Sequence, residues 1–174
     1  MSFFKSIWTL APFGALAFVL LGGLSACSGL ALSKPFAWPG LATAQARLTG
    51  AGRDTVVLAI THAQLIGAER AAFDRGADQV VEMLPAQPGI VGYSVRSRVL
   101  GHEVWTATVW RDDASIDAFV RSPEHLTAVR QGSSAIAKVE YHRVQVRVSD
   151  LPLDWSRVLA ELERAAARAA ATPR

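Results

Sequence analysis

The hydrophobic positions of this chain follow two alternating periods, and each change of period marks a new element. Residues 56–60 form a continuous apolar run rich in β-branched side chains, which is typical of a buried strand. From Leu65 to Leu84, apolar residues recur at three- and four-residue steps, and charged residues occupy the positions between them. This pattern predicts an amphipathic helix, which Pro85 ends because proline lacks the N–H that a helix needs.

Residues 89–110 have the pattern of an antiparallel hairpin. Apolar and polar side chains alternate over residues 89–100, with Tyr93 on the apolar side. Residues 101–102 read Gly-His and can make a tight turn, after which residues 103–110 return as the next strand.

Two short helical segments are expected after the hairpin. Asp112 or Asp113 can cap the first, because a carboxylate accepts hydrogen bonds from the unpaired N–H groups of a first turn. Ser122 and Pro123 begin the second, with a hydroxyl at the cap and proline in the first turn.

The last part of the chain predicts one more strand and a terminal helix. In residues 137–149 the apolar positions change phase, which a β-bulge near His142 and Arg143 would explain. An amphipathic helix starts at Trp155 and fades into an Ala- and Arg-rich tail.

The order of these elements is β-α-β-β-α-β followed by a helix. With a right-handed crossover, this order predicts an α+β ferredoxin-like sheet with helices on one face, over residues 55–150, and a C-terminal helix and tail over residues 151–174. Trp105 and Trp110 fall on opposite faces of one strand, so the second sheet face is also partly apolar. We therefore expect a homodimer that covers this face.

The N-terminal residues have the layout of an export segment. Lys5 precedes a long uncharged apolar run, as in a secretory signal peptide. The run ends in Leu-Ser-Ala followed by Cys27, which looks like the lipobox of bacterial lipoproteins, where the cysteine thiol receives diacylglycerol. The sequence therefore predicts a signal peptide or membrane segment over residues 1–26, lipidation at Cys27 and a tether over residues 27–54.

An uncleaved transmembrane helix is the alternative for this segment, because the run exceeds the roughly 20 residues that span a bilayer. Both interpretations attach the protein to the bilayer through its N-terminus. Both also place the domain outside the cytoplasm, facing the periplasm or the exterior of a bacterial cell envelope.

Charge and composition narrow the function further. The formal net charge is only +3, and the basic residues are scattered among acidic ones. Nucleic-acid binding therefore has little support. The four histidines lack the spacing of a metal site, so no metal is expected.

Three segments resemble the antibiotic-biosynthesis-monooxygenase-like family: Pro88–Tyr93, Thr108–Trp110 and Ile116–His125. The family's Pro-Gly-x-x-Gly-aromatic pattern, its Trp before an acidic turn and its Ser-x-x-His recur there in this order. The resemblance implies the dimeric α/β-barrel form of the ferredoxin-like fold. It also implies a pocket between helices and sheet, where an electron-rich aromatic or quinol-type substrate or haem reacts with O₂. Characterised oxygenases of this family need no metal or flavin, so no cofactor is expected.

The haem-degrading branch of the family carries an Asn on the first strand, and a Trp and an axial His on the helix after the third strand. At those places this chain has Thr61 or His62, Phe119 and Val129. None of the three matches, so haem degradation is not favoured.

His125 is the leading candidate for a catalytic group, because histidine can accept a phenolic proton near neutral pH. Tyr93 and Trp110 could orient an aromatic ring, although both residue types also pack commonly in cores.

Three further residues are candidates for ligand binding: His62, Phe119 and Arg98. His62 is expected to close the first strand, and Arg98 shares a face with Arg96, where the pair could hold a carboxylate. Two functional classes remain open: a cofactor-independent monooxygenase, and a non-catalytic ligand-binding or structural lipoprotein of the same fold.

Overall fold

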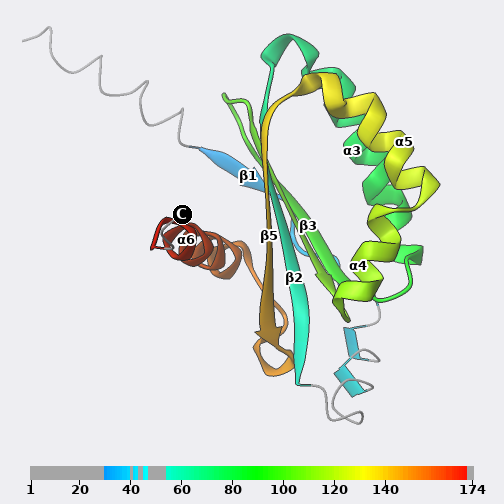
Figure 1. The fold of residues 1–174 in the computed structure, drawn as a ribbon, viewed down its shortest axis with the longest axis vertical. Coiled ribbons are helices and arrows are strands. Elements are labelled where there is room, and N and C mark those ends of the chain that lie inside the picture. Colours follow the sequence, from blue (N-terminus) through cyan, green and yellow to red (C-terminus); the bar gives the residue numbers. More distant parts are fainter. Residues whose placement is uncertain (1–29, 40, 43–44, 47–53, 172–174) are drawn as a thin grey trace, which may run out of the picture.

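The computed structural model describes residues 30–39, 41–42, 45–46 and 54–171. Within these ranges one five-stranded sheet lies between two helical layers, with α3, α4 and α5 on one face and α6 on the other (Figure 1). The elements are β1 (Ala31–Ser33), β2 (Thr55–Leu65), α3 (Arg70–Met83), β3 (Ile90–Arg98), β4 (Glu103–Trp110), α4 (Asp113–Val120), α5 (Pro123–Gly132), β5 (Ile136–Arg147) and α6 (Trp155–Ala171).

The strand order is β1-β3-β4-β2-β5, and each neighbouring pair is antiparallel. Without β1, this is the ferredoxin-like arrangement, in which each βαβ unit leaves room for a strand of the other unit. The predicted β-α-β-β-α-β order and the added C-terminal helix are therefore confirmed.

The first helical layer packs on one face of the sheet through α3 and α4. Its largest apolar cluster joins Val57 and Trp110 on the sheet to Leu84, Ile116 and Phe119. Helix α5 lies along α3, and the approach is close at Gly76, where a Cβ atom would stand 2.9 Å from a carbonyl oxygen of α5. This layer is the one expected to carry the functional site.

Helix α6 covers the opposite face of the sheet with its apolar stripe. Trp155 and Val158 belong to a buried cluster with Trp105, Val109 and Val146 of the sheet. The indole Nε1 of Trp155 donates a hydrogen bond of 2.8 Å to the hydroxyl of Ser94 on β3.

The segment before β2 also covers this second face. Strand β1 pairs with β3 at the sheet edge, and Ala37 continues the pairing with Tyr93. Trp38 lies directly on Gly92, where any side chain would collide with its ring, and Phe36 stacks on Trp38 with ring centroids 5.2 Å apart. The hydroxyl of Ser94 donates in turn to the carbonyl of Lys34, at 2.6 Å.

These contacts change two expectations from the sequence. Residues 30–39 fall within the predicted tether, yet they pair with the sheet and pack on it. The apolar face that suggested a homodimer is already covered by α6 and by this segment. The homodimer stays a prediction. The apolar face no longer calls for a second chain, because residues of the same chain cover it.

The bulge expected at His142 and Arg143 is wrong. The β2–β5 register runs without a shift through both residues, and the irregularity lies at the far end, between Gln64 and Leu65. The apolar positions change phase because β5 buries Val139 against the first helical layer and Val146 against α6. The apolar positions of β5 thus change phase because the strand packs on different elements along its length, and its register with β2 stays the same through His142 and Arg143.

Candidate functional site

Three of the predicted site residues form one aromatic row between the sheet and the first helical layer. Trp110 at the end of β4 contacts Phe119 on α4, with ring centroids 5.1 Å apart. Phe119 then contacts His125 on α5, with centroids 4.7 Å apart and an angle of 58° between the rings. The row connects the buried sheet surface to the half-buried imidazole.

Two helix caps hold this row in place. The Asp112 carboxylate accepts hydrogen bonds from the backbone N–H of Ser115 at 2.8 Å and from its hydroxyl at 2.6 Å. These bonds to Ser115, together with the neighbouring guanidinium of Arg111, lower the pKa of Asp112 from 3.8 to about 2. Asp112 therefore stays ionised, as an acceptor at the first turn of α4 requires.

The second cap places His125 itself. The hydroxyl of Ser122 accepts a hydrogen bond of 3.2 Å from the backbone N–H of His125, and Pro123 occupies the first position of α5. Because α4 and α5 are separated only by Arg121 and Ser122, the imidazole falls back over the end of α4. The Ser-x-x-His pattern thus acts as a cap that sets the place of the imidazole.

The surroundings of His125 favour its neutral form. Burial lowers the pKa of His125 below its usual 6.5, and the hydrogen bond with the Val120 carbonyl offsets part of this effect. Nδ1 lies 3.2 Å from that carbonyl oxygen. Because a carbonyl only accepts, Nδ1 carries the proton and Nε2 keeps its lone pair. A neutral imidazole with a free Nε2 can accept a proton from a ligand.

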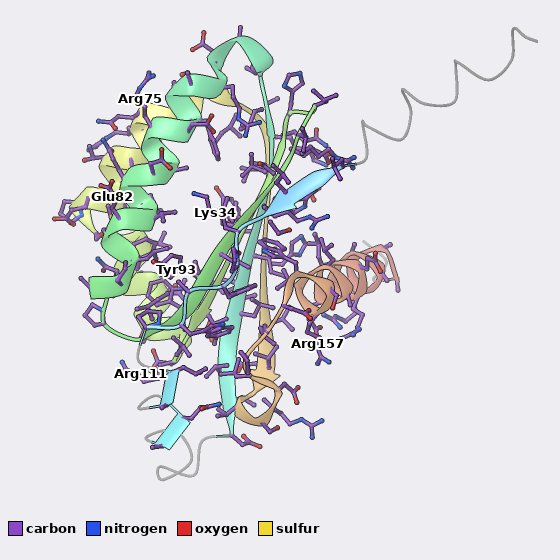
Figure 2. All side chains as sticks on the ribbon, turned by 180° about the vertical axis from the view of Figure 1, so that it is seen from behind. Lys34, Arg75, Glu82, Tyr93, Arg111 and Arg157 are labelled. Atoms are coloured by element: carbon purple, nitrogen blue, oxygen red, sulfur yellow. The ribbon has the colours of Figure 1, made fainter. Side chains whose placement is uncertain are left out.

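Trp110 and Tyr93 have less freedom than the sequence suggested. Trp110 is 1% exposed, and its Nε1 already donates to the hydroxyl of Thr108 at 2.8 Å. Tyr93 lies on the same side of the sheet, which α3 covers, and packs half-buried against the Trp110 cluster (Figure 2). Trp110 is therefore part of the core, Phe119 is also buried at 8% exposed, and His125 alone forms the accessible end of the row.

The other two candidates, His62 and Arg98, lie on the opposite face of the sheet. The His62 ring stacks on Trp105 with centroids 4.8 Å apart, and Arg98 stands over the same indole. Strand β2 continues to Leu65, so His62 lies within it instead of closing it. These two residues cannot share a ligand with His125 through the sheet.

The sequence did not single out the acidic residues that accompany this second group. Glu103 forms an ion pair with Arg98 and lies 3.1 Å from Nε2 of His62, while Glu140 lies 3.7 Å from its Nδ1. The hairpin turn between Arg98 and Glu103 was the signal that could have predicted their pairing. Glu140 had no such signal, because its contact depends on the non-local β2–β5 register.

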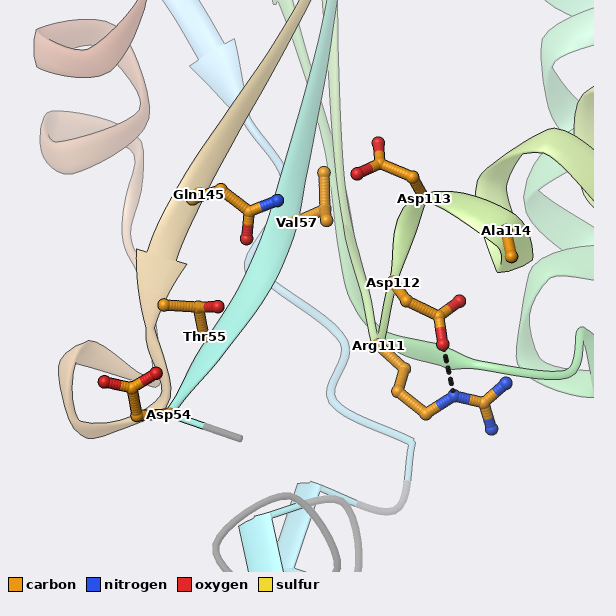
Figure 3. Close-up of a pocket in the computed structure, with 8 residues that line it drawn as sticks. All are labelled: Asp54, Thr55, Val57, Arg111, Asp112, Asp113, Ala114 and Gln145. Atoms are coloured by element: carbon orange, nitrogen blue, oxygen red, sulfur yellow. Dashed lines mark hydrogen bonds and ion pairs between the residues drawn. The ribbon is translucent and has the colours of Figure 1, made fainter. Parts of the chain in front are cut away.

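A cavity of about 460 Å³ lies elsewhere, between the start of β2, the last residues of β5 and the start of α4 (Figure 3). Its lining includes Asp54, Asp112, Asp113, Arg111 and Gln145, and none of the predicted site residues. Its carboxylates are engaged in part with basic neighbours: Asp112 pairs with Arg111 and Asp113 with Arg143. This polar lining does not suit an aromatic ligand, which would need apolar walls.

Cys27 and the export segment lie outside the described residues. Across residues 30–171, apart from the gaps given above, no helix is both long and apolar enough to cross a membrane. The same described part of the chain holds no group of three His, Cys, Asp or Glu side chains arranged for a metal ion.

Comparison with known proteins gives a family match over the part of the chain that holds the aromatic row. A family model described as antibiotic biosynthesis monooxygenase matches residues 57–131. The match runs from β2 into α5 and includes the whole aromatic row. No curated protein matches this chain.

Solved structures of the same fold come from several bacteria. A candidate monooxygenase from Lactobacillus acidophilus has a TM-score of 0.50 and 15% identity, covering 55% of this chain and 46% of its own. This chain thus spans less than half the length of that protein. Candidate antibiotic biosynthesis monooxygenases from Chloroflexus aurantiacus and Nitrosomonas europaea have TM-scores of 0.45 and 0.48. They share 21% and 14% identity over 51% and 55% of this chain, and 90% and 91% of their own lengths. At 15% identity, the likeness to the Lactobacillus acidophilus structure shows the fold alone.

The environment of His125 predicts how this residue titrates. NMR of the imidazole should give a midpoint below 6.5, because burial disfavours the charged ring. As the pH falls through 6.5, the unfolded chain binds this proton before the folded chain does, so the free energy of unfolding should decrease. The decrease between pH 7.5 and 5 should be smaller in His125→Gln. A midpoint at or above 6.5, or the same pH dependence in both proteins, would contradict this account of His125.

Proposed function

We propose that this chain is an exported, membrane-anchored oxidoreductase of the antibiotic biosynthesis monooxygenase kind, which oxidises a small aromatic or quinol-type substrate with O₂. The observation that carries the proposal is the state of His125: Nδ1 is held by the Val120 carbonyl, and Nε2 is left as a proton acceptor. Phe119, itself only 8% exposed, packs beside the imidazole, so the surroundings of a substrate bound there would be partly aromatic. The family match over residues 57–131 supports the same activity.

The chemistry balances without a reductant. His125 accepts the hydroxyl proton of the substrate, because a phenolate gives up an electron to O₂ far more readily than a phenol. One oxygen atom of O₂ becomes bonded to a ring carbon, whose C–H bond breaks, and the other oxygen atom leaves as water with that hydrogen and the former hydroxyl proton. A hydroxynaphthalene and O₂ thus give a naphthoquinone and water. The proton on His125 is returned when that water forms.

A second candidate function is a non-catalytic binding or structural module of the same fold. The observation that favours it is the packing of the site, because Trp110 and Phe119 fill the space between sheet and helices. The cavity of about 460 Å³ lies away from His125. A substrate must therefore bind at the outer end of the aromatic row or displace a side chain.

Oxygen uptake separates the two candidates. The purified protein should consume O₂ with at least one of a panel of quinols, catechols and hydroxynaphthalenes, and form the quinone. General-base catalysis typically contributes 10²–10⁴-fold, so His125→Ala should lower the turnover by that order. Leu126→Ala is the matched control, because Leu126 is the next residue on α5 and its side chain is exposed.

Each other outcome has a defined meaning. No oxygen uptake with any member of the panel would favour the non-catalytic module. If His125→Ala consumes oxygen as fast as the wild-type protein, the oxygenase activity is supported, but His125 is not its base.

The membrane anchor is the second part of the proposal. Its support is the Leu-Ser-Ala-Cys sequence ending at Cys27, directly after the apolar run. Lipidation there would place the domain in the cell envelope, on the outer side of a membrane. The attached group would be diacylglycerol on the Cys27 thiol.

Labelled fatty acid tests this attachment in a bacterial host. The wild-type chain should incorporate the label and mature to a shorter form, whereas Cys27→Ser should incorporate none and remain as the longer precursor. Ser25→Ala is a suitable control, because a small residue is retained there and the cysteine is untouched. Absence of label from the wild-type chain would exclude the lipoprotein and favour an uncleaved membrane helix.

A further inference from the structure

More than half of the large exposed apolar side chains lie toward one end of the domain. Nine large apolar residues are exposed among the described residues, and five of them lie at the start of β1, at the β3–β4 turn and after β2. We call this set the apical patch: Leu30, Leu32, Ile66, Val99 and Leu100. The start of β1, the β3–β4 turn and the connection after β2 all lie toward the same end of the sheet (Figure 1). Clustering of this kind marks an interaction surface, since single exposed apolar residues are otherwise scattered.

Hydrogen bonds hold the apical patch together as one surface. The backbone N–H of Val99 donates to the carbonyl of Leu30 at 2.9 Å, and that of Leu65 donates to His102 at 2.7 Å. Arg70 adds a bond of 3.3 Å from its guanidinium to the carbonyl of Gly101. The β3–β4 turn is therefore fixed between β1 on one side and the start of the first helical layer on the other.

The anchor residue is close to this patch in the sequence. Three residue steps separate Cys27 from Leu30, and a fully extended chain covers at most about 11 Å in three steps. The predicted tether of residues 27–54 would allow a much larger distance, but β1 ends that freedom at Leu30. A lipid on Cys27 would therefore hold the apical patch at the membrane surface, whatever the conformation of the two residues between.

Most basic side chains near the patch are paired with acids. Arg98 pairs with Glu103, Arg70 with Asp74 and Lys138 with Glu140. Arg96 differs, because its guanidinium donates to the neutral hydroxyl of Ser33 at 2.6 Å. Because the other three basic groups are neutralised by adjacent acids, contact with a membrane would depend on apolar side chains more than on anionic lipids.

From these observations we propose that the apical patch lies against the lipid bilayer, with Leu100 among the acyl chains at the tip. This inference rests on the proposed lipid attachment at Cys27.

The proposed contact with the membrane also orients the candidate site. His125 is at the first turn of α5, whereas Ile66 bonds to Ala135 beyond the other end of that helix, and ten helical residues extend about 15 Å. His125 would thus lie on the aqueous side, away from the membrane.

Depth-dependent quenching tests the orientation in the full-length chain. The chain is extracted with its anchor and reconstituted into phosphatidylcholine vesicles. Leu100→Cys and Leu126→Cys are each labelled with a polarity-sensitive dye, and the treated wild-type chain gives the background. Both leucines are exposed, at 70% and 44%, but Leu126 is on α5, outside the patch.

Lipids with a nitroxide on the acyl chain should quench the dye at position 100 several-fold more than the dye at position 126. The difference should persist when the salt concentration is raised, and an added Val99→Asp should reduce it. Equal quenching at both positions, in protein that floats with the vesicles, would overturn the orientation and leave the anchor intact. Failure of the wild-type chain to float would overturn both, because the inference depends on the anchor.

Discussion

The structure depends on a single constraint: a sheet with two apolar faces needs cover on both. The buried hydroxyl of Ser94 is the point where the second cover is fixed. It accepts a hydrogen bond from Trp155 of α6 and donates one to the carbonyl of Lys34. One side chain of β3 therefore joins the C-terminal helix to the N-terminal segment. A buried hydroxyl with both roles satisfied is stable, whereas the loss of either partner leaves a polar group without compensation.

The two covers leave the two faces of the sheet with different accessibility. The α6 face is closed by the chain itself. His62 on this face lies close to the carboxylates of Glu103 and Glu140. The helical layer on the other face leaves His125 half-buried, with one nitrogen able to accept a proton. We therefore propose that any chemistry takes place at His125, the outer end of the Trp110–Phe119–His125 row, and that the proposed membrane attachment is at the opposite end of the domain.

Much of the fold could be predicted because its elements carry strong local signals. The period changes between residues 56 and 110 and the Ser122-Pro123 cap depend only on neighbouring residues. Strand β1 could not be predicted, since its three residues have no pattern and pair with β3 more than sixty positions later. The alternation over residues 89–100 would place Val91 on the same face as Tyr93, but a register shift beside Gly92 turns Val91 toward α6. In the site, the resemblance found His125 and Phe119, but only the strand register shows that His62 and Arg98 lie on the other face.

The most direct test of the account is a double-mutant cycle between Ser94 and Trp155, measured as the free energy of unfolding in denaturant. Ser94→Ala removes the acceptor, and Trp155→Phe removes the donor while retaining an aromatic ring. If the hydrogen bond fixes α6 to the sheet, the two substitutions should couple by roughly 0.5–1.5 kcal/mol. Costs that add to within about 0.3 kcal/mol would contradict it, because independent sites behave in that way.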